Sequence, residues 1–306
     1  MTMPNFLVIG AQKSGTSSLH YYLGQHPEIF MSALKEPGFF YFAGRPNDFR
    51  GPYKRFKRQT IVTTEEAYRK LFQNVRDEKA IGESTPVYMF ASHAAEQIHR
   101  YLPGAGLIAI LRHPADRAYS EYLMRLRDGV EPCGDFREAL RDQPRSPGDQ
   151  SEIGDYLQRG FYHAQLTRYF GLFSRQQILV SLYDDLLSDP AGLMRNIFSF
   201  LGVHKDFAAD LSERHNVSGM VRNPGRRAFW KHSRALRDVV RPVLPPRLRH
   251  AAFQWATRDT IKPPLSPEFR AELTETYRED ILRLQDLIQR DLSHWLEAEQ
   301  RTGGAD

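Results

Sequence analysis

The stretch FLVIGAQKSGTSSL, residues 6–19, places an apolar run directly before a glycine-containing loop and a helix-like pattern. Large apolar residues at 6–9 are typical of a buried parallel strand. Gly10 and Gly15 frame the loop, and a helical pattern then runs over 16–24. A strand, a glycine loop and a helix N-terminus in this order indicate anion binding, because backbone N–H groups converge there.

The lysine of this loop does not stand where the common nucleotide loop has it. In G-x-x-x-x-G-K-[ST] the lysine follows the second glycine and the hydroxyl binds Mg²⁺. Here Thr16 follows Gly15, and Lys13 lies inside the loop. The loop can still hold a phosphate, with hydroxyl groups from Thr16, Ser17 and Ser18, but it lacks the arrangement that holds a metal-bridged triphosphate.

The rest of the chain alternates between strand-like and helical patterns. Short apolar runs predict strands at 6–9, 79–82, 107–111 and 178–182. Helical patterns occupy 16–24, 64–73, 91–101, 114–127, 162–173 and 190–201. This alternation predicts an α/β fold with a parallel sheet flanked by helices, in which ligands bind at the carboxyl ends of the strands.

Length allows one large domain or two small ones, composition is typical of a soluble globular protein, and the pattern along the chain favours a single domain over 1–306. The chain has 306 residues, of which 41% are apolar and 26% charged. No apolar run approaches the roughly 20 residues of a membrane span, and no secretory signal precedes the first strand. A single cysteine, Cys133, cannot form an internal disulfide, so we expect a reducing, cytoplasmic location. A pattern over about 268–296 predicts a closing helix.

A second candidate for anion binding follows the third predicted strand, in LRHPADRAYSEYLMRLRDG, residues 111–129. Arg112 stands at the end of the strand, and Pro114 suits the first turn of the next helix. Ser120 follows two turns into that helix, and Arg117 is its neighbour one turn earlier. A guanidinium and a hydroxyl that converge on one phosphate would form an anion clamp.

Together these stretches resemble the sulfotransferase family that uses 3′-phosphoadenylyl sulfate. GAQKSGTSSL is similar to the family's loop for the 5′-phosphosulfate, and LRHPADRAYSEY to its site for the 3′-phosphate. HPEIFMSALKEPGFF, residues 26–40, resembles the base-bearing segment of the heparan-sulfate-type branch. The likeness continues, in the family's order, through GESTPVYM (82–89), RGFYHAQLTRYF (159–170), SLYDDLLSDP (181–190) and RHNVSG (214–219).

This resemblance implies a P-loop-NTPase-like sulfotransferase fold and 3′-phosphoadenylyl sulfate as the donor. The donor has no β and γ phosphates for a metal to bridge, so no metal ion is expected. Lys13 would instead neutralise the charge that develops on the departing phosphate oxygen. The resemblance assigns the 5′-phosphosulfate to Gln12, Lys13, Ser14, Gly15, Thr16 and Ser17, and the 3′-phosphate to Arg112 and Ser120.

The resemblance also implies a catalytic base, Glu36. Transfer to an alcohol or amine needs a group that removes the acceptor proton, and partial burial by Pro37, Phe39 and Phe40 would raise the pKa of such a base. The plain alternative is a solvated glutamate that pairs with Lys35. A histidine base, as in the cytosolic branch of the family, is the second candidate.

One departure bears on the acceptor. The heparan-sulfate branch has Glu-Lys after the second strand, with the lysine in the active site, whereas this chain has Glu83 and Ser84. The missing lysine weakens the assignment of a sulfated-glycan acceptor. Glu83 is either a second active-site carboxylate or the cap of a turn. Glu83 and His113 are the next candidates for the base, and the histidines show no metal-ligand spacing.

Two basic stretches contribute to the net charge of +5. Residues 45–58 follow the predicted base and could line the acceptor cleft. Residues 222–262 form a basic helical appendage with interspersed tryptophan and phenylalanine. This appendage suits either peripheral contact with an anionic membrane, at its inner face, or a solvated helix that covers the sheet. No nucleic-acid motif accompanies the charge.

The sequence therefore predicts a sulfotransferase that moves a sulfuryl group to a hydroxyl by in-line displacement, with transfer to an amine as the second choice. The expected acceptor is a carbohydrate or glycolipid, followed by a lipid or another small molecule. Two other classes stay open. One is an ATP-dependent kinase, which would require Mg²⁺. The other is a non-catalytic, anion-binding protein of the membrane surface.

Overall fold

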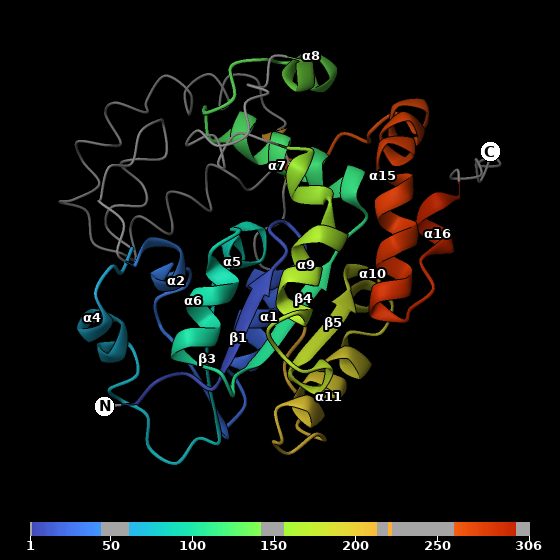
Figure 1. Ribbon diagram of the computed structural model, residues 1–306. Helices are drawn as coiled ribbons and strands as arrows, with labels where there is room; N and C mark the ends of the chain where they lie inside the picture. Colours follow the sequence, from blue (N-terminus) through green and yellow to red (C-terminus); the bar gives the residue numbers. More distant parts are fainter. Residues whose placement is uncertain (1, 44–60, 142–155, 213–219, 222–259, 298–306) are drawn as a thin grey trace.

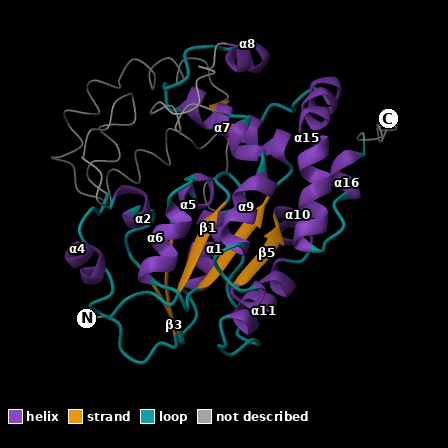
Figure 2. Ribbon diagram, in the orientation of Figure 1, coloured by secondary structure: helices purple, strands orange, loops and turns teal. Residues whose placement is uncertain are grey.

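A computed structural model of the chain describes residues 2–43, 61–141, 156–212, 220–221 and 260–297. Its centre is a five-stranded parallel sheet in the order β2-β3-β1-β4-β5. A separate antiparallel pair joins β6 (Met220–Val221) to β7 (Thr260–Ile261). The carboxyl ends of the parallel strands all lie at the same end of the main sheet, near α7 (Pro114–Arg127) (Figures 1 and 2).

The predicted apolar runs all form strands of the main sheet: β1 (Phe6–Gly10), β3 (Ala80–Ser84), β4 (Gly106–Leu111) and β5 (Ile178–Leu182). Strand β1 is buried at every position, as expected for a strand covered on both faces. The sequence did not predict β2 (Ile29–Met31), which forms the edge beside β3. It has three residues, too few for a recognisable pattern.

One face of the sheet packs against a large aromatic core. Leu7, Ile9 and Leu107 point toward this side and contact helices that precede or follow β3 and β4. These helices are α2 (Phe39–Phe42), α4 (Glu65–Lys70), α5 (Val87–Phe90), α6 (Ala94–Tyr101) and α9 (Tyr162–Phe170). Burial of apolar area is the main driving force of folding. The packing of this face therefore holds β1 in place, and with it the loop that follows β1.

The opposite face packs against fewer helices. Phe6, Val8 and Ile108 lie on this side. They contact α1 (Thr16–Leu23) and α11 (Pro190–Phe200), together with Leu186 of α10 (Tyr183–Ser188). A third cluster joins α7, α8 (Phe136–Arg141) and the start of α15 (Pro267–Ile288). Helices therefore cover both faces, as the sequence predicts.

The C-terminal part differs from the single helix predicted over 268–296. Helix α15 ends at Ile288, Gln289 takes a left-handed conformation with φ 54°, and the short helix α16 covers Ser293–Leu296. The break lets Leu292 and Trp295 return to the core, where both are buried. Figure 1 shows α15 and α16 beside the edge of the sheet formed by β5.

Two predicted segments cannot be compared with the structure. The basic loop 45–58 lies outside the described residues, and so does the basic appendage over 222–262 except for residues 260–262. Within the described part of the chain, no helix is long and apolar enough to cross a membrane.

Candidate functional site

A cavity of about 580 Å³ lies where the loop after β1 meets α7 and α10. It brings together nearly all of the residues that the sequence assigns to the site. Those that line it are Gln12, Lys13, Gly15, Thr16, Ser17, Glu36, Arg112 and Ser120. Ser14 is the exception, since its side chain is fully buried and does not line the cavity.

The glycine at the end of the loop is required by both conformation and space. Gly15 has φ 92°, a left-handed conformation that side chains disfavour. A Cβ at this position would lie 2.7 Å from Cδ2 of Leu186 and 3.1 Å from the ring of Tyr183. The loop therefore packs directly against α10, and helix α1 begins at Thr16 with its N-terminus toward the cavity.

Lys13 provides a partly buried cation within the loop. Its Nζ lies 3.4 Å from Sδ of Met124 on α7. Burial, with a smaller contribution from Arg127, lowers the pKa of Lys13 from 10.5 to about 8, against the opposing effect of Glu121. An anion bound in the cavity would favour the charged form, since an opposite charge compensates for lost hydration.

Arg112 connects the loop to α10. Its Nη1 donates to the backbone oxygen of Lys13 at 3.3 Å, and its guanidinium lies 4.7 Å from the centre of the Tyr183 ring. The Tyr162 hydroxyl donates to the backbone oxygen of Arg112 at 2.9 Å. These contacts fix both the backbone and the side chain of Arg112. Ser120 faces the same cavity from α7.

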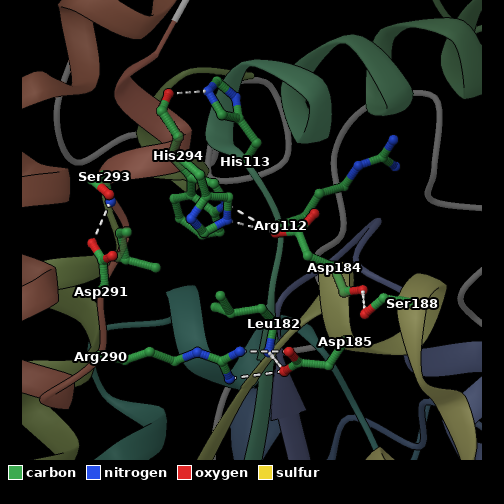
Figure 3. Close-up of polar contacts among 12 residues, drawn as sticks. Arg112, His113, Leu182, Asp184, Asp185, Ser188, Arg290, Asp291, Ser293 and His294 are labelled. Carbon is green, nitrogen blue, oxygen red and sulfur yellow. Dashed lines mark hydrogen bonds and ion pairs between the residues drawn. The ribbon is translucent and has the colours of Figure 1, made fainter.

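A C-terminal clasp, residues 290–295, fixes the helix that carries Tyr183 (Figure 3). Arg290 donates to both carboxylate oxygens of Asp185, at 2.8 and 2.5 Å, and Asp185 also accepts from the N–H of Leu182. The Trp295 indole donates to Asp184 at 2.9 Å. The clasp therefore holds α10 in its place beside the cavity.

The clasp makes a testable prediction for stability. Arg290→Gln removes a bidentate, charge-assisted contact and is expected to lower the free energy of unfolding by about 1–2 kcal/mol. Arg283→Gln removes an exposed ion pair with Glu279 on the same helix and should change it by less than about 0.5 kcal/mol. Urea denaturation of both variants measures the difference. Equal effects would mean that the clasp does not fix α10.

A buried cluster of arginines surrounds Glu121 on the wall of the cavity. Arg117, Arg125 and Arg159 all approach the Glu121 carboxylate. Burial would raise the pKa of Glu121, but these three guanidinium groups hold it at about 2. Arg159 also donates to Oε1 of Gln12. Because Gln12 belongs to the loop, the cluster connects α7 and the turn before α9 to the anion-binding loop.

Glu36 lines the cavity, but its surroundings differ from those expected for a catalytic base. The predicted shield is not formed, because Phe39 and Phe40 turn into the core and the Glu36 side chain is 42% exposed. The Lys35 ammonium pairs with Glu36 at 2.5 Å, as the plain alternative expects. Glu36 has φ 60°, a strained conformation for a residue with a side chain.

The other two candidates for the base lie outside the cavity. Glu83 is fully buried, and burial raises the pKa of this carboxyl to about 7. His113 packs against Trp295 and lies 2.9 Å from its backbone oxygen, and burial lowers the pKa of His113 to about 4. Neither side chain lines the cavity, whereas Glu36 does.

Sequence reasoning missed several side chains that line the cavity. Tyr183, Arg125, Arg159 and Lys262 all face it. Arg159 and Tyr183 lie in two of the segments that carry the family resemblance, which was the available signal. Lys262 follows β7. Burial lowers the pKa of Lys262, and the charge of the nearby Arg112 lowers it further. Among the described residues, no group of three or more His, Cys, Asp or Glu could hold a metal ion.

Comparison with known proteins gives consistent matches. A family model described as "Sulfotransferase family" matches residues 4–206. Among solved structures, the sulfotransferase from Alicyclobacillus acidocaldarius is 32% identical, with a TM-score of 0.74. That alignment covers 97% of this chain and 100% of the other.

Two curated human proteins are also similar. Bifunctional heparan sulfate N-deacetylase/N-sulfotransferase 3 is 26% identical over 309 residues, which cover 97% of this chain and 31% of the relative. Carbohydrate sulfotransferase 15 is 25% identical over 315 residues, which cover 83% of this chain and 55% of the relative. The chain thus spans about a third to a half of the length of these relatives.

Proposed function

Because this chain belongs to the sulfotransferase family, we propose that it transfers a sulfuryl group from 3′-phosphoadenylyl sulfate to a hydroxyl group of a carbohydrate. One observation carries the proposal. A single cavity gathers the cationic loop around Lys13, the pair Arg112 and Ser120, and the carboxylate of Glu36. These are the groups that a doubly phosphorylated donor and an alcohol acceptor would need.

The cavity suits such a donor at both of its phosphate groups. The N–H groups of the loop and of α1 can bind the 5′-phosphate, and Lys13 neutralises its charge. Arg112 and Ser120 can bind the 3′-phosphate. Apolar and aromatic side chains line the cavity beside them, at Tyr22, Tyr183, Leu186, Leu187 and Leu211, and offer a surface for the adenosine.

The proposed reaction is an in-line displacement at sulfur. Glu36 removes the proton of the acceptor hydroxyl as its oxygen attacks the sulfur atom. The bond between sulfur and the 5′-phosphate oxygen breaks, and the electron pair stays on that oxygen, close to Lys13. The products are a sulfate ester and adenosine 3′,5′-bisphosphate. The exposed carboxyl of Glu36 can then release its proton to solvent.

Two observations support a carbohydrate acceptor. Tyr41 and Phe42 line the cavity together with Glu36, and aromatic faces suit the apolar face of a sugar ring. Both human relatives described above are named for sulfation of carbohydrates or heparan sulfate. We infer that the acceptor is a sugar, with its ring packed beside these aromatic side chains. A sugar amine is the second choice, since one of these relatives is named an N-sulfotransferase.

Transfer of label tests the proposed function. The protein is incubated with donor labelled with sulfur-35 and with a panel of neutral and uronic-acid-containing oligosaccharides, lipids and phenols. We expect label in an oligosaccharide, unchanged when EDTA is added. Transfer to lipids or phenols alone would contradict the carbohydrate acceptor. Failure of every acceptor, with no release of adenosine 3′,5′-bisphosphate, would contradict sulfuryl transfer itself.

Variants of the second phosphate site give a further prediction. Arg112→Ala should weaken the binding of adenosine 3′,5′-bisphosphate by about 1.5–3 kcal/mol, the scale of a charge-assisted hydrogen bond. Ser120→Ala should weaken it by less, because a neutral hydroxyl contributes about 1 kcal/mol. Isothermal titration calorimetry measures both. Wild-type affinity in the two variants would show that the 3′-phosphate binds elsewhere.

A further inference from the structure

A buried hydrogen-bond network contacts the loop that follows Glu36, and its central residue does not line the cavity. Its centre is the Glu83 carboxylate near the end of β3, which is fully buried. Oε2 of Glu83 accepts from the Thr85 hydroxyl at 2.7 Å, and Oε1 accepts from the Tyr68 hydroxyl at 3.3 Å. The Tyr88 hydroxyl lies near the same carboxylate, and burial together with the charge of Glu83 raises the pKa of Tyr88. The mechanism uses none of these groups directly.

Two of these hydroxyl groups also contact the segment that carries Glu36. The N–H of Gly38 donates to Oγ1 of Thr85, and the N–H of Phe40 donates to the Tyr88 hydroxyl, each at 3.4 Å. Gly38 and Phe40 stand at the start of α2, where backbone N–H groups have no partner within the helix. The hydroxyl groups supply those partners.

The charge of Glu83 determines which way the Thr85 hydroxyl points. Each hydroxyl has one proton, whereas an ionised carboxylate can only accept. The proton of Thr85 therefore points to Glu83, and a lone pair of the same hydroxyl faces the N–H group of Gly38. Burial raises the pKa of Glu83 to about 7, although the hydroxyl donors oppose this. Above that pH the carboxyl is ionised and accepts only.

The loop itself needs such support. Glu36 and Gly38 both have left-handed backbones, with φ 60° and 72°, and such conformations persist only where their surroundings enforce them. We propose that Glu83 is a positioning residue, which holds the loop 36–40 through the hydroxyl group of Thr85. This inference rests on the proposed role of Glu36. Glu83 does not line the cavity, which favours a positioning role over direct contact with a substrate.

Four variants at neighbouring positions form the test. Glu83→Gln keeps the shape but replaces one acceptor oxygen by a donor. Thr85→Val keeps the shape but removes the hydroxyl, and Thr85→Ser restores it. Ser84→Ala is the matched control, because Ser84 is equally buried and its hydroxyl has no hydrogen-bond partner among the described residues.

We expect Glu83→Gln and Thr85→Val to lower kcat by about 10-fold to 100-fold at pH 8, the scale of a misplaced catalytic group. Thr85→Ser and Ser84→Ala should retain activity close to that of the wild type. The Kd of adenosine 3′,5′-bisphosphate should stay within about 2-fold in all four, because the donor site is separate. Amide hydrogen exchange of residues 36–42 should become faster in the first two variants only.

A double-mutant cycle separates positioning from general destabilisation. If Glu83 acts through Glu36, Glu83→Gln should have no further effect on kcat in a Glu36→Gln background. Additive losses would overturn the inference, and so would unchanged kcat and unchanged exchange in Glu83→Gln and Thr85→Val. If the wild-type protein transfers no label, the proposed function fails, while the exchange experiment still decides whether Glu83 holds the loop.

Discussion

Replacing Glu36 with glutamine is expected to lower kcat by about 10²-fold to 10⁴-fold, the usual contribution of a general base. Glutamine keeps the shape of the side chain but cannot take up the acceptor proton. The affinity for adenosine 3′,5′-bisphosphate should stay nearly unchanged, because no acceptor proton is involved in donor binding. Steady-state kinetics and calorimetry on the same preparation measure the two quantities.

Glu66→Gln provides the control for this substitution. Glu66 is an exposed residue of α4 that pairs with Lys70 and does not line the cavity. Its replacement should leave kcat at the wild-type value. If Glu36→Gln also retained full turnover, the proton would have to leave the acceptor by another route, and the role proposed for Glu83 would lose its basis.

Replacing Lys13 with alanine is expected to impair donor binding and chemistry together. In the proposed mechanism, Lys13 faces both the 5′-phosphate of the donor and the oxygen on which charge develops. Loss of one such donor lowers kcat by about 10²-fold to 10³-fold, and donor binding should weaken by about 1.5–3 kcal/mol. This pattern differs from that of Glu36→Gln, in which binding is preserved. Normal donor affinity in Lys13→Ala would contradict the proposed position of the phosphate.

Because Lys13 titrates, the affinity for adenosine 3′,5′-bisphosphate should depend on pH. Burial lowers the pKa of Lys13 to about 8 in the unliganded protein, so the ammonium loses its proton as pH rises through that value. The Kd of adenosine 3′,5′-bisphosphate should therefore increase above about pH 8. Lys13→Arg should abolish this increase, because the guanidinium stays protonated. An unchanged pH profile in Lys13→Arg would assign the titration to another group.

Most of the fold could be predicted from the sequence, because a covered parallel sheet leaves a strong pattern. Four strands are continuous apolar runs, and the family match and the solved structure of a relative confirm the predicted sulfotransferase fold. The break in the closing helix could not be predicted. Gln289 is an ordinary helix residue, and the packing of Trp295 against the core determines the break.

In the site, too, some residues could be predicted from the sequence and others could not. The loop 10–15 and Arg112 follow strands of the sheet, and neighbouring parallel strands bring such residues together at one edge. Arg159 and Tyr183 reach the cavity through contacts with residues far away in the sequence, Gln12 and Arg112. No local pattern encodes such contacts. The exposure of Glu36 depends on how α2 turns Phe39 and Phe40 into the core, which sequence spacing does not determine.

A calorimetric comparison of nucleotides tests whether the cavity binds a donor with a 3′-phosphate and without a metal ion. Wild-type protein is titrated with adenosine 3′,5′-bisphosphate, with adenosine 5′-monophosphate, and with ATP in the presence of Mg²⁺. We expect the bisphosphate to bind most tightly, with EDTA present, and its advantage over the monophosphate to disappear in Arg112→Ala. Tight binding of ATP with Mg²⁺, together with no measurable binding of the bisphosphate, would contradict the account and favour a kinase.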